Sequence, residues 1–170
     1  MRSRIFTLGH SRHPIERFIE LAKTHGVELI VDVRGRPFSR FNPQFNRERF
    51  RAALAAAGID YAWMGETLSG RPEATEFYGA DGEVLWDKLR DWPPLHDGLA
   101  EVMRKSRDTT LALVCAEEDP LRCHRRFLLT PPLAAQGAEV VHVRGDGRLE
   151  SEPEVAAREK PRRRQKDLFD

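Results

Sequence analysis

The sequence lacks the features that mark membrane or secreted proteins. Its 170 residues contain no apolar run near the length of a membrane span, and the first residues, MRSRIFTLGHSRHP, lack the apolar core and cleavage site of a signal peptide. We therefore expect a cytoplasmic protein. Charge of one sign is not in excess either, because 28 basic and 27 acidic residues give a formal net charge of +1. Any contact with nucleic acid must then depend on a local patch.

Cysteine is scarce as well, since the chain contains only Cys115 and Cys123. In a reducing compartment, two such thiols are more often free, metal-bound or catalytic than joined in a structural disulfide. The length suits one domain with a sizeable core, and no internal repeat is evident. We place this domain at residues 1–147 and a flexible, charged tail at residues 148–170.

Five short apolar segments, rich in β-branched or aromatic residues, predict β-strands. They are RIFTLG (4–9), VELIVDV (27–33), IDYAWM (59–64), TTLALVC (109–115) and EVVHV (139–143). The segments between them predict helices. These are PIERFIELAKTHG, RERFRAALAAAG capped by Asn46, EVLWDKLRDW and DGLAEVMRKS separated by Pro93 and Pro94, and a last helix from about Arg122 that Pro131 and Pro132 interrupt or kink.

Alternating strands and helices favour an α/β fold with an open, mostly parallel, five-stranded sheet and helices on both faces. In such a sheet, the segments that leave the carboxyl ends of the strands meet at one edge, where ligands usually bind. Those segments are GHSRHP, RGRPFSRFNPQFN, GETLSGRPE and AEEDPLRCHRR. They also hold the unusual polar residues, so we expect a functional site at this edge.

The candidate catalytic residues lie at the ends of two of these strands. They are Asp32, Glu117, Cys123 and His124. Asp32 ends an otherwise apolar strand, which suggests a polar role at the sheet edge, although an internal ion pair with Arg34 is the alternative. Glu117 can act as general acid or base if it is partly buried.

Cys123 is a candidate thiolate, because the first turn of a helix favours anions and lowers the pKa of a nearby thiol. Three acidic residues close by, Glu117, Glu118 and Asp119, oppose that shift. The sequence does not decide whether the pKa of Cys123 is raised or lowered. For Cys115, we favour a packing role, as a small apolar side chain at the end of a buried strand, over a catalytic role.

Metal binding is an alternative use of the same thiols. Cys115, Cys123, His124 and His10 are possible ligand types for a transition metal. Their spacing is not one of the tight pairs that mark structural zinc sites. We therefore expect neither a metal nor another cofactor.

Several further residues are candidates for binding an anion or a substrate. They are His10, Ser11, Arg34, Arg36, Ser39 and Arg125. Ser11 lies in no Gly-x-Ser-x-Gly motif, so orienting or anion-binding roles suit it better than nucleophilic catalysis. The segment RFNPQFN brings Phe41 and Phe45 beside polar residues, a mixture suited to stacking on a base or to forming a lid on the core.

The motifs TLGHS, VDVRGRPFSRFNPQFN, GID-Y, GRP and VCAEEDPLRCHR, in this order, resemble a large bacterial family, the domain of unknown function 488. The resemblance covers roughly residues 4–147. It implies an α/β fold and a shared site, but no activity. The matching positions are His10, Ser11, Asp32, Arg34, Pro37, Ser39, Glu117, Cys123, His124 and Arg125.

The segment ESEPEVAAREKPRRRQKDLFD is polar and without apolar period, as in disordered tails. Within it, QKDLF (165–169) resembles the short peptide by which bacterial proteins bind the DNA polymerase sliding clamp. The resemblance implies that Gln165, Leu168 and Phe169 contact the clamp. The alternative is a solubilising tail whose apolar residues pack on the domain.

These observations leave three hypotheses. The first is an enzyme of DNA repair or replication that hydrolyses a glycosidic or phosphoester bond of DNA or of a nucleotide. The second is a non-catalytic adaptor that binds nucleic acid, with salt-sensitive affinity and no turnover. The third is a thiol- or metal-dependent protein, which includes sulfur transfer because LIVDVRGRP is similar to a strand of rhodaneses.

Overall fold

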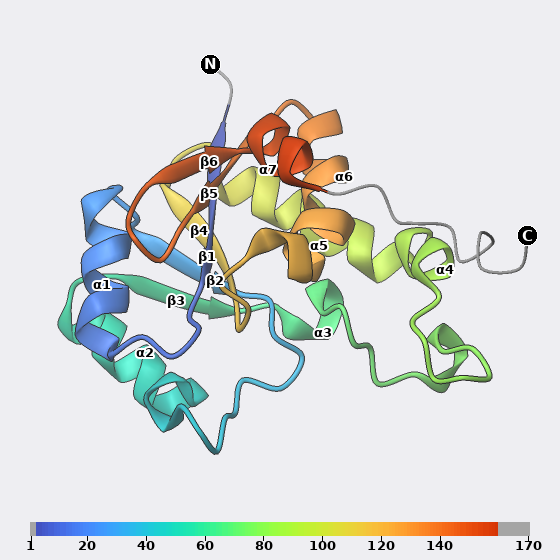
Figure 1. The fold of residues 1–170 in the computed structure, drawn as a ribbon, viewed down its shortest axis with the longest axis horizontal. Helices are drawn as coiled ribbons and strands as arrows, with labels where there is room; N and C mark the ends of the chain where they lie inside the picture. Colours follow the sequence, from blue (N-terminus) through green and yellow to red (C-terminus); the bar gives the residue numbers. More distant parts are fainter. Residues whose placement is uncertain (1–2, 160–170) are drawn as a thin grey trace, which may run out of the picture.

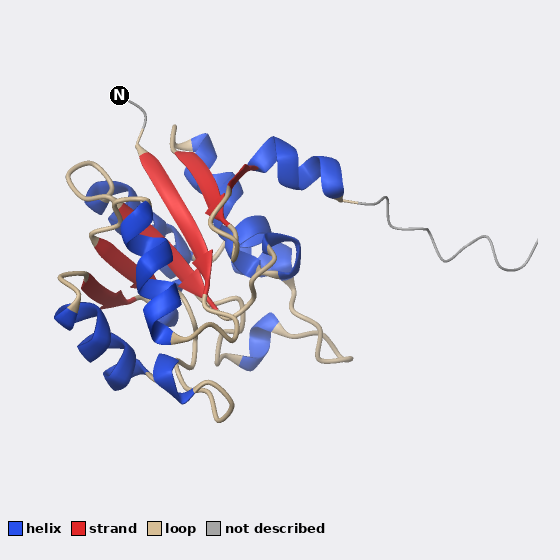
Figure 2. Cartoon of the chain, turned by 60° about the vertical axis from the view of Figure 1, so that its left-hand side comes forward, coloured by secondary structure: helices blue, strands red, loops and turns tan. Residues whose placement is uncertain are grey.

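A computed structural model of the chain describes residues 3–159 and shows one six-stranded sheet with helices on both faces (Figures 1 and 2). The strand order is β3-β2-β4-β1-β5-β6. The strands are β1 (Arg4–Gly9), β2 (Leu29–Asp32), β3 (Asp60–Trp63), β4 (Leu111–Cys115), β5 (Glu139–Val143) and β6 (Leu149–Ser151). The first five are parallel to their neighbours, and β6 is antiparallel to β5. The predicted α/β class, the mostly parallel sheet and its five strands are confirmed.

Alternate residues of the strands face two separate cores. On one face, the core between the sheet and the first two helices contains Phe6, Leu8, Ile30 and Val114. On the other, the core contains Ile5, Val31, Leu113 and Cys115. Strands that are buried on both faces have almost no polar residues, which is why the sequence identified them as continuous apolar segments.

Seven α-helices and several short 3-10 turns connect the strands within residues 3–159. The helices are α1 (Ile15–Thr24), α2 (Arg47–Ala56), α3 (Gly65–Leu68), α4 (Trp86–Arg90), α5 (Pro93–Lys105), α6 (Thr130–Ala135) and α7 (Glu152–Arg158). In Figures 1 and 2, α1 and α2 cover one face of the sheet and α5 and α6 cover the other. Asn46 precedes α2 as predicted, but its side chain accepts a hydrogen bond from Ser39 N–H instead of capping the helix.

Prolines shape two helices differently from the prediction. The two helices predicted around Pro93 and Pro94 are present as α4 and α5, but the prolines form the first turn of α5, where a missing N–H costs nothing, and do not lie between the helices. After β4, the chain forms a π-helix, Arg125–Leu129, before α6. Thr130 donates both its backbone N–H and its hydroxyl to Arg125 O, since Pro131 and Pro132 have no N–H to donate to the preceding turn.

The prediction of a free tail from residue 148 is wrong for its first part, which forms β6 and α7. Strand β6 pairs with β5, and α7 begins with a capping box between Ser151 and Glu154. Both elements are polar, so apolar periodicity gave no sign of them. Residues 160–170, with the clamp-like peptide 165–169, lie outside the described residues.

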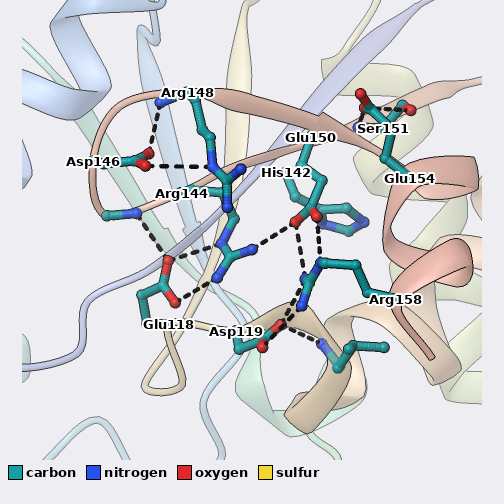
Figure 3. Close-up of polar contacts among 12 residues, drawn as sticks. Glu118, Asp119, His142, Arg144, Asp146, Arg148, Glu150, Ser151, Glu154 and Arg158 are labelled. Carbon is teal, nitrogen blue, oxygen red and sulfur yellow. Dashed lines mark hydrogen bonds and ion pairs between the residues drawn. The ribbon is translucent and has the colours of Figure 1, made fainter. Parts of the chain in front are cut away.

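Ion pairs hold β6 and α7 against the loop that follows β4 (Figure 3). Arg144 binds Glu118 through both carboxylate oxygens, at 2.9 Å each, and Glu150 at 2.7 Å. Arg158 binds the same Glu150 and reaches Asp119 at 3.0 Å. These ion pairs add to the apolar contact of Val155, the buried side chain of α7. Within residues 3–159, no helix is both long and apolar enough to span a membrane.

Candidate functional site

A cleft of about 900 Å³ opens at the carboxyl ends of β1, β2 and β4. In Figure 1, the light-blue segment after β2 and the green segment after α3 both extend beyond these strand ends. Four predicted loops contribute to the cleft, as expected for a parallel sheet. Its lining includes His10, Ser11, Arg12, Arg34, Arg36, Phe38, Ser39, Ser69, Gly70, Arg71, Glu73, Tyr78, Trp86, Cys115, Glu117, Arg122, His124 and Phe127.

A buried chain of hydrogen bonds joins Asp32, Arg34 and His10 behind the cleft wall. Asp32 is fully buried and accepts from Arg34 Nη2 at 2.6 Å, from Arg34 Nε at 2.8 Å and from the Tyr61 hydroxyl at 2.7 Å. Arg34 also lies 3.2 Å from His10 Nε2. Because its oxygens are occupied and it does not line the cleft, Asp32 orients Arg34 and cannot reach water in the cleft as a base.

The two ring nitrogens of His10 have fixed roles. Arginine only donates, so His10 Nε2 accepts from Arg34, and Nδ1 carries the proton that it donates to Ser11 O at 2.9 Å. Burial, assisted by the Arg34 charge, lowers the pKa of His10 to about 4. His10 is therefore neutral at physiological pH, and its ring stacks on Phe45.

The backbone after β1 fits closely against the loop after β4. His10 N–H and Ser11 N–H donate to Cys115 O and Ala116 O, both at 2.9 Å, which extends the ladder beyond the strand end. A side chain at Gly9 would collide with Glu117 O, and this explains the glycine of TLGHS. Ser11 has a φ of 46°, an uncommon value outside glycine that is often found at functional sites.

The acidic residues of AEEDP do not act together, because Glu118 and Asp119 bind Arg144 and Arg158 (Figure 3) and do not line the cleft. The Arg144 guanidinium lowers the pKa of Glu118, and Arg158 lowers that of Asp119 to about 2. Only Glu117 faces the cleft. Burial raises the pKa of Glu117, but hydrogen bonds from its own backbone and from the two cysteines outweigh this and leave it below the usual value. The negative charge expected at the cleft is thus mostly neutralised elsewhere.

Cys115 and Cys123 lie side by side beneath Glu117, and both are buried. Burial by itself raises the pKa of Cys115. The hydrogen bond from the Cys123 thiol and the Arg125 charge outweigh this effect and bring the pKa below its ordinary value. Arg125 Nη1 donates to Cys115 Sγ at 3.2 Å. Burial and the hydrogen bond to Cys115 raise the pKa of Cys123. Cys115, which the sequence favoured as a filler, is therefore the more acidic thiol, and Cys123 stays protonated.

Arg125 and His124 position this part of the cleft wall. Arg125 is fully buried and donates to Glu118 O at 2.6 Å as well as to Cys115. His124 Nε2 lies 3.1 Å from Leu68 O, so it carries the ring proton, and Nδ1 accepts from the Cys123 thiol at 3.8 Å. Burial lowers the pKa of His124 to about 4. Gly70 leaves room for the imidazole ring, because a Cβ there would overlap it.

The cleft is rich in arginine and aromatic side chains. Within residues 3–159, four lining arginines make no ion pair with an acidic residue: Arg12, Arg36, Arg71 and Arg122. The aromatic residues of the lining are Phe38, Tyr78, Trp86 and Phe127. Phe38 is 72% exposed, and the neighbouring Phe41 is 87% exposed. Phe45, by contrast, is buried in the core.

The structure brings most of the expected site together. His10, Ser11, Arg34, Arg36, Ser39, Glu117 and His124 line the cleft, whereas Asp32, Cys123 and Arg125 lie behind its wall. Sequence reasoning missed Cys115, Arg12, Arg71, Arg122 and Trp86 as parts of the cleft. The quoted loops GHSRHP, GETLSGRPE and AEEDPLRCHRR already contained all three of these arginines, so their place after strand ends was the signal that could have identified them.

Comparison with known families agrees with the motifs. The family model described as Domain of unknown function DUF488 matches residues 14–130, a shorter range than the resemblance suggested, and leaves out His10 and Ser11. No curated protein and no solved structure gives a significant match. Because the match covers more than half of the sequence, the chain belongs to the family of Domain of unknown function DUF488.

Proposed function

We propose that the protein binds single-stranded nucleic acid or a nucleotide in this cleft and hydrolyses a phosphoester or glycosidic bond of it. The observation that carries the proposal is the combination, within residues 3–159, of four arginines without acidic partners and of aromatic rings around one cleft at the ligand-binding edge of the sheet. Among these rings Phe38 is exposed, and Tyr78, Trp86 and Phe127 are half-buried. Guanidinium groups bind phosphates, and aromatic faces stack on bases. A ligand that is both anionic and aromatic satisfies both features.

Charge supports an anionic ligand. Elsewhere on this side of the molecule, arginines such as Arg126, Arg144 and Arg158 are consumed by ion pairs. Of the arginines that line the cleft, Arg34 is paired with Asp32, but the other four make no ion pair within residues 3–159. The acids that line the cleft with them are Glu73 and Glu117. A cleft that is lined by more positive than negative charges attracts anions even when the net charge of the protein is near zero.

The size and walls of the cleft support a nucleotide unit. Its volume of about 900 Å³ is at the upper end of the range for small-molecule sites. Phe38 lies on the exposed loop after β2, and Tyr78 and Trp86 line the same cleft from the segment after α3. Rings on two separate loops allow a base to be held between them, while phosphates contact the arginines.

Glu117 and His124 are the groups that we assign to the chemistry. Glu117 is ionised and reaches the cleft, so it can orient a water molecule and accept its proton. His124 lies on the same wall with Nδ1 as an acceptor. Arg34, held by Asp32, would contribute charge to a developing oxyanion.

Binding tests the proposal. The double variant Arg36→Ala/Arg71→Ala is expected to bind a fluorescent single-stranded DNA oligonucleotide more weakly and with a flatter salt dependence. Each lost phosphate contact on a single strand lowers the slope of log K against log[salt] by about 0.7, so two contacts lower it by about 1.4. Fluorescence anisotropy over a NaCl series measures both quantities.

The matched control removes the same charge from the opposite edge of the sheet. Lys23→Ala/Arg107→Ala changes two exposed cations near the amino ends of the strands and should leave both affinity and slope unchanged. Equal losses in the two double variants would reject the cleft as the binding site. Salt-sensitive binding without cleavage of the oligonucleotide or of nucleotides would favour the non-catalytic adaptor.

We propose further that the bacterial sliding clamp is a partner, through residues 165–169. The support is the sequence QKDLF itself, in which Leu168 and Phe169 are the apolar anchors. The full chain is expected to bind an immobilised clamp, and Leu168→Ala/Phe169→Ala to lose this binding, whereas Lys166→Ala retains it. If the double variant binds like the unchanged chain, the peptide is not the docking site.

A further inference from the structure

Two thiols and a carboxylate converge at the floor of the cleft. The ligand atoms of Cys115, Glu117 and Cys123 all lie within 4.8 Å of one another. In a tetrahedral zinc site, with Zn–S near 2.3 Å and Zn–O near 2.1 Å, neighbouring ligand atoms are about 3.6–3.8 Å apart. Small rotations of these side chains therefore suffice to surround one ion, since Glu117 is exposed and free to adjust.

The local fold holds these ligands in place. Cys115 ends β4, Cys123 follows the 3-10 turn Pro120–Arg122, and Glu117 lies between them. The Asp119 side chain accepts from Leu121 N–H, and Arg125 donates to Glu118 O, so the loop is fixed at both ends. Ligands on such a preformed loop lose little conformational entropy when an ion binds.

Arg125 balances the charge of the cluster. With both thiols deprotonated and Glu117 ionised, the ligands carry three negative charges. A divalent cation and the buried Arg125 guanidinium supply three positive charges, which makes the group neutral. Without a cation, one of the buried thiols must keep its proton. Arg125 donates to Cys115 Sγ at 3.2 Å, the outer-shell contact that commonly orients a metal ligand.

His124 adds a fourth group beside the cluster. Its Nε2 proton is donated to Leu68 O, the arrangement found in metal sites where a backbone carbonyl fixes the tautomer. Its Nδ1 accepts a hydrogen bond from Cys123 Sγ at 3.8 Å, and His124 lines the wall of the cleft. Cys115 and Glu117 also line the cleft, so a coordination position between these residues would face the bound ligand.

We propose that Cys115, Glu117 and Cys123 form a binding site for a thiophilic divalent cation, with zinc as the best fit, and that its fourth position faces the cleft. Two sulfur ligands favour zinc over magnesium or calcium. Three protein ligands with an open position are typical of catalytic rather than structural zinc sites. This deepens the proposed function and rests on it in one respect only: in a hydrolase, the open position would hold the attacking water, and Glu117 would then bind the ion in place of acting as the base.

The experiment measures metal binding directly. The full chain, purified under reducing conditions and stripped of metal, is expected to bind one Zn²⁺ per chain, and with Co²⁺ to show thiolate-to-metal charge-transfer absorption. Cys115→Ser and Cys123→Ser should each markedly lower that absorption, because each removes one of the two thiolate ligands. Glu117→Gln, at an exposed position, should fold normally and weaken Zn²⁺ binding by more than about tenfold, because even outer-shell partners are worth 10–100-fold.

Glu73→Gln is the matched control, since Glu73 lines the same cleft but lies outside the cluster, and it should bind Zn²⁺ like the unchanged chain. The proposal is overturned if the unchanged chain binds no Zn²⁺, or if Glu117→Gln and Glu73→Gln bind it equally well. A chain that binds oligonucleotide but not Zn²⁺ refutes the metal site alone. One that binds Zn²⁺ but neither oligonucleotide nor nucleotide refutes the proposed function alone.

Discussion

Replacing Glu117 by glutamine is expected to lower turnover of nucleic acid or nucleotide by about 10²–10⁴-fold, the usual contribution of general acid–base catalysis. The amide has the same shape but cannot accept a proton. Glu117 is exposed and is the one acid of its loop that faces the cleft, so its loss should not unfold the chain. Single-turnover cleavage of the oligonucleotide identified by the binding test measures the effect, and thermal unfolding checks the fold.

Glu73→Gln again provides the comparison, because it removes the same charge from the same cleft. Glu73→Gln should change turnover by less than about threefold, since exposed substitutions have small effects. A small change would show that the loss in Glu117→Gln does not come from the removed charge alone. Turnover that survives in Glu117→Gln would remove Glu117 from the mechanism. Zinc content measured on the same samples separates loss of a proton acceptor from loss of a bound ion.

Replacing Asp32 by asparagine is expected to lower the free energy of unfolding by about 3–5 kcal/mol, because it leaves the buried Arg34 guanidinium without a counter-charge. Asp32 is fully buried, and the side chain of Arg34 is only 7% exposed. Typical domains are stable by about 5–15 kcal/mol, so this loss is a large fraction of the total. Urea unfolding followed by circular dichroism measures it.

The control is an ion pair at the opposite edge of the sheet. Arg4 and Glu139 are about half exposed, so Glu139→Gln should cost no more than about 1 kcal/mol. A loss of less than 1 kcal/mol in Asp32→Asn would mean that Arg34 does not depend on this carboxylate. In the double variant Asp32→Asn/Arg34→Met, part of the loss should be recovered, because no unpaired charge is then left in the interior.

The sequence predicted those parts of the fold that apolar residues determine. Strands β1 to β5 are continuous apolar segments because both faces of the sheet are covered. Strand β6 and α7 were missed because ion pairs hold them to a large extent, and α7 buries one apolar side chain, Val155. Glu150, for example, is bound by Arg144 and Arg158, and no periodicity of hydrophobic residues reports such a contact.

The location of the site was predicted from the sequence, but the roles of its individual residues were not. Position after strand ends was enough to bring His10, Arg34 and Glu117 to one cleft. The separate roles of neighbouring acids were not predictable, because Glu118 is turned from the cleft by Arg144, which lies 26 residues away along the chain. The order of the two thiols likewise depends on which of them Arg125 contacts.

The fully buried Arg125 side chain has a consequence for how a ligand is received. It ties the turn after β4 to the sulfur of Cys115 before anything binds, so the floor of the cleft needs little rearrangement. The rim is different, because Phe38 and Phe41 project from a loop with few contacts of their own. Adjustment to ligands of varied sequence would then fall on the rim alone, and the reacting groups would keep one geometry for all of them.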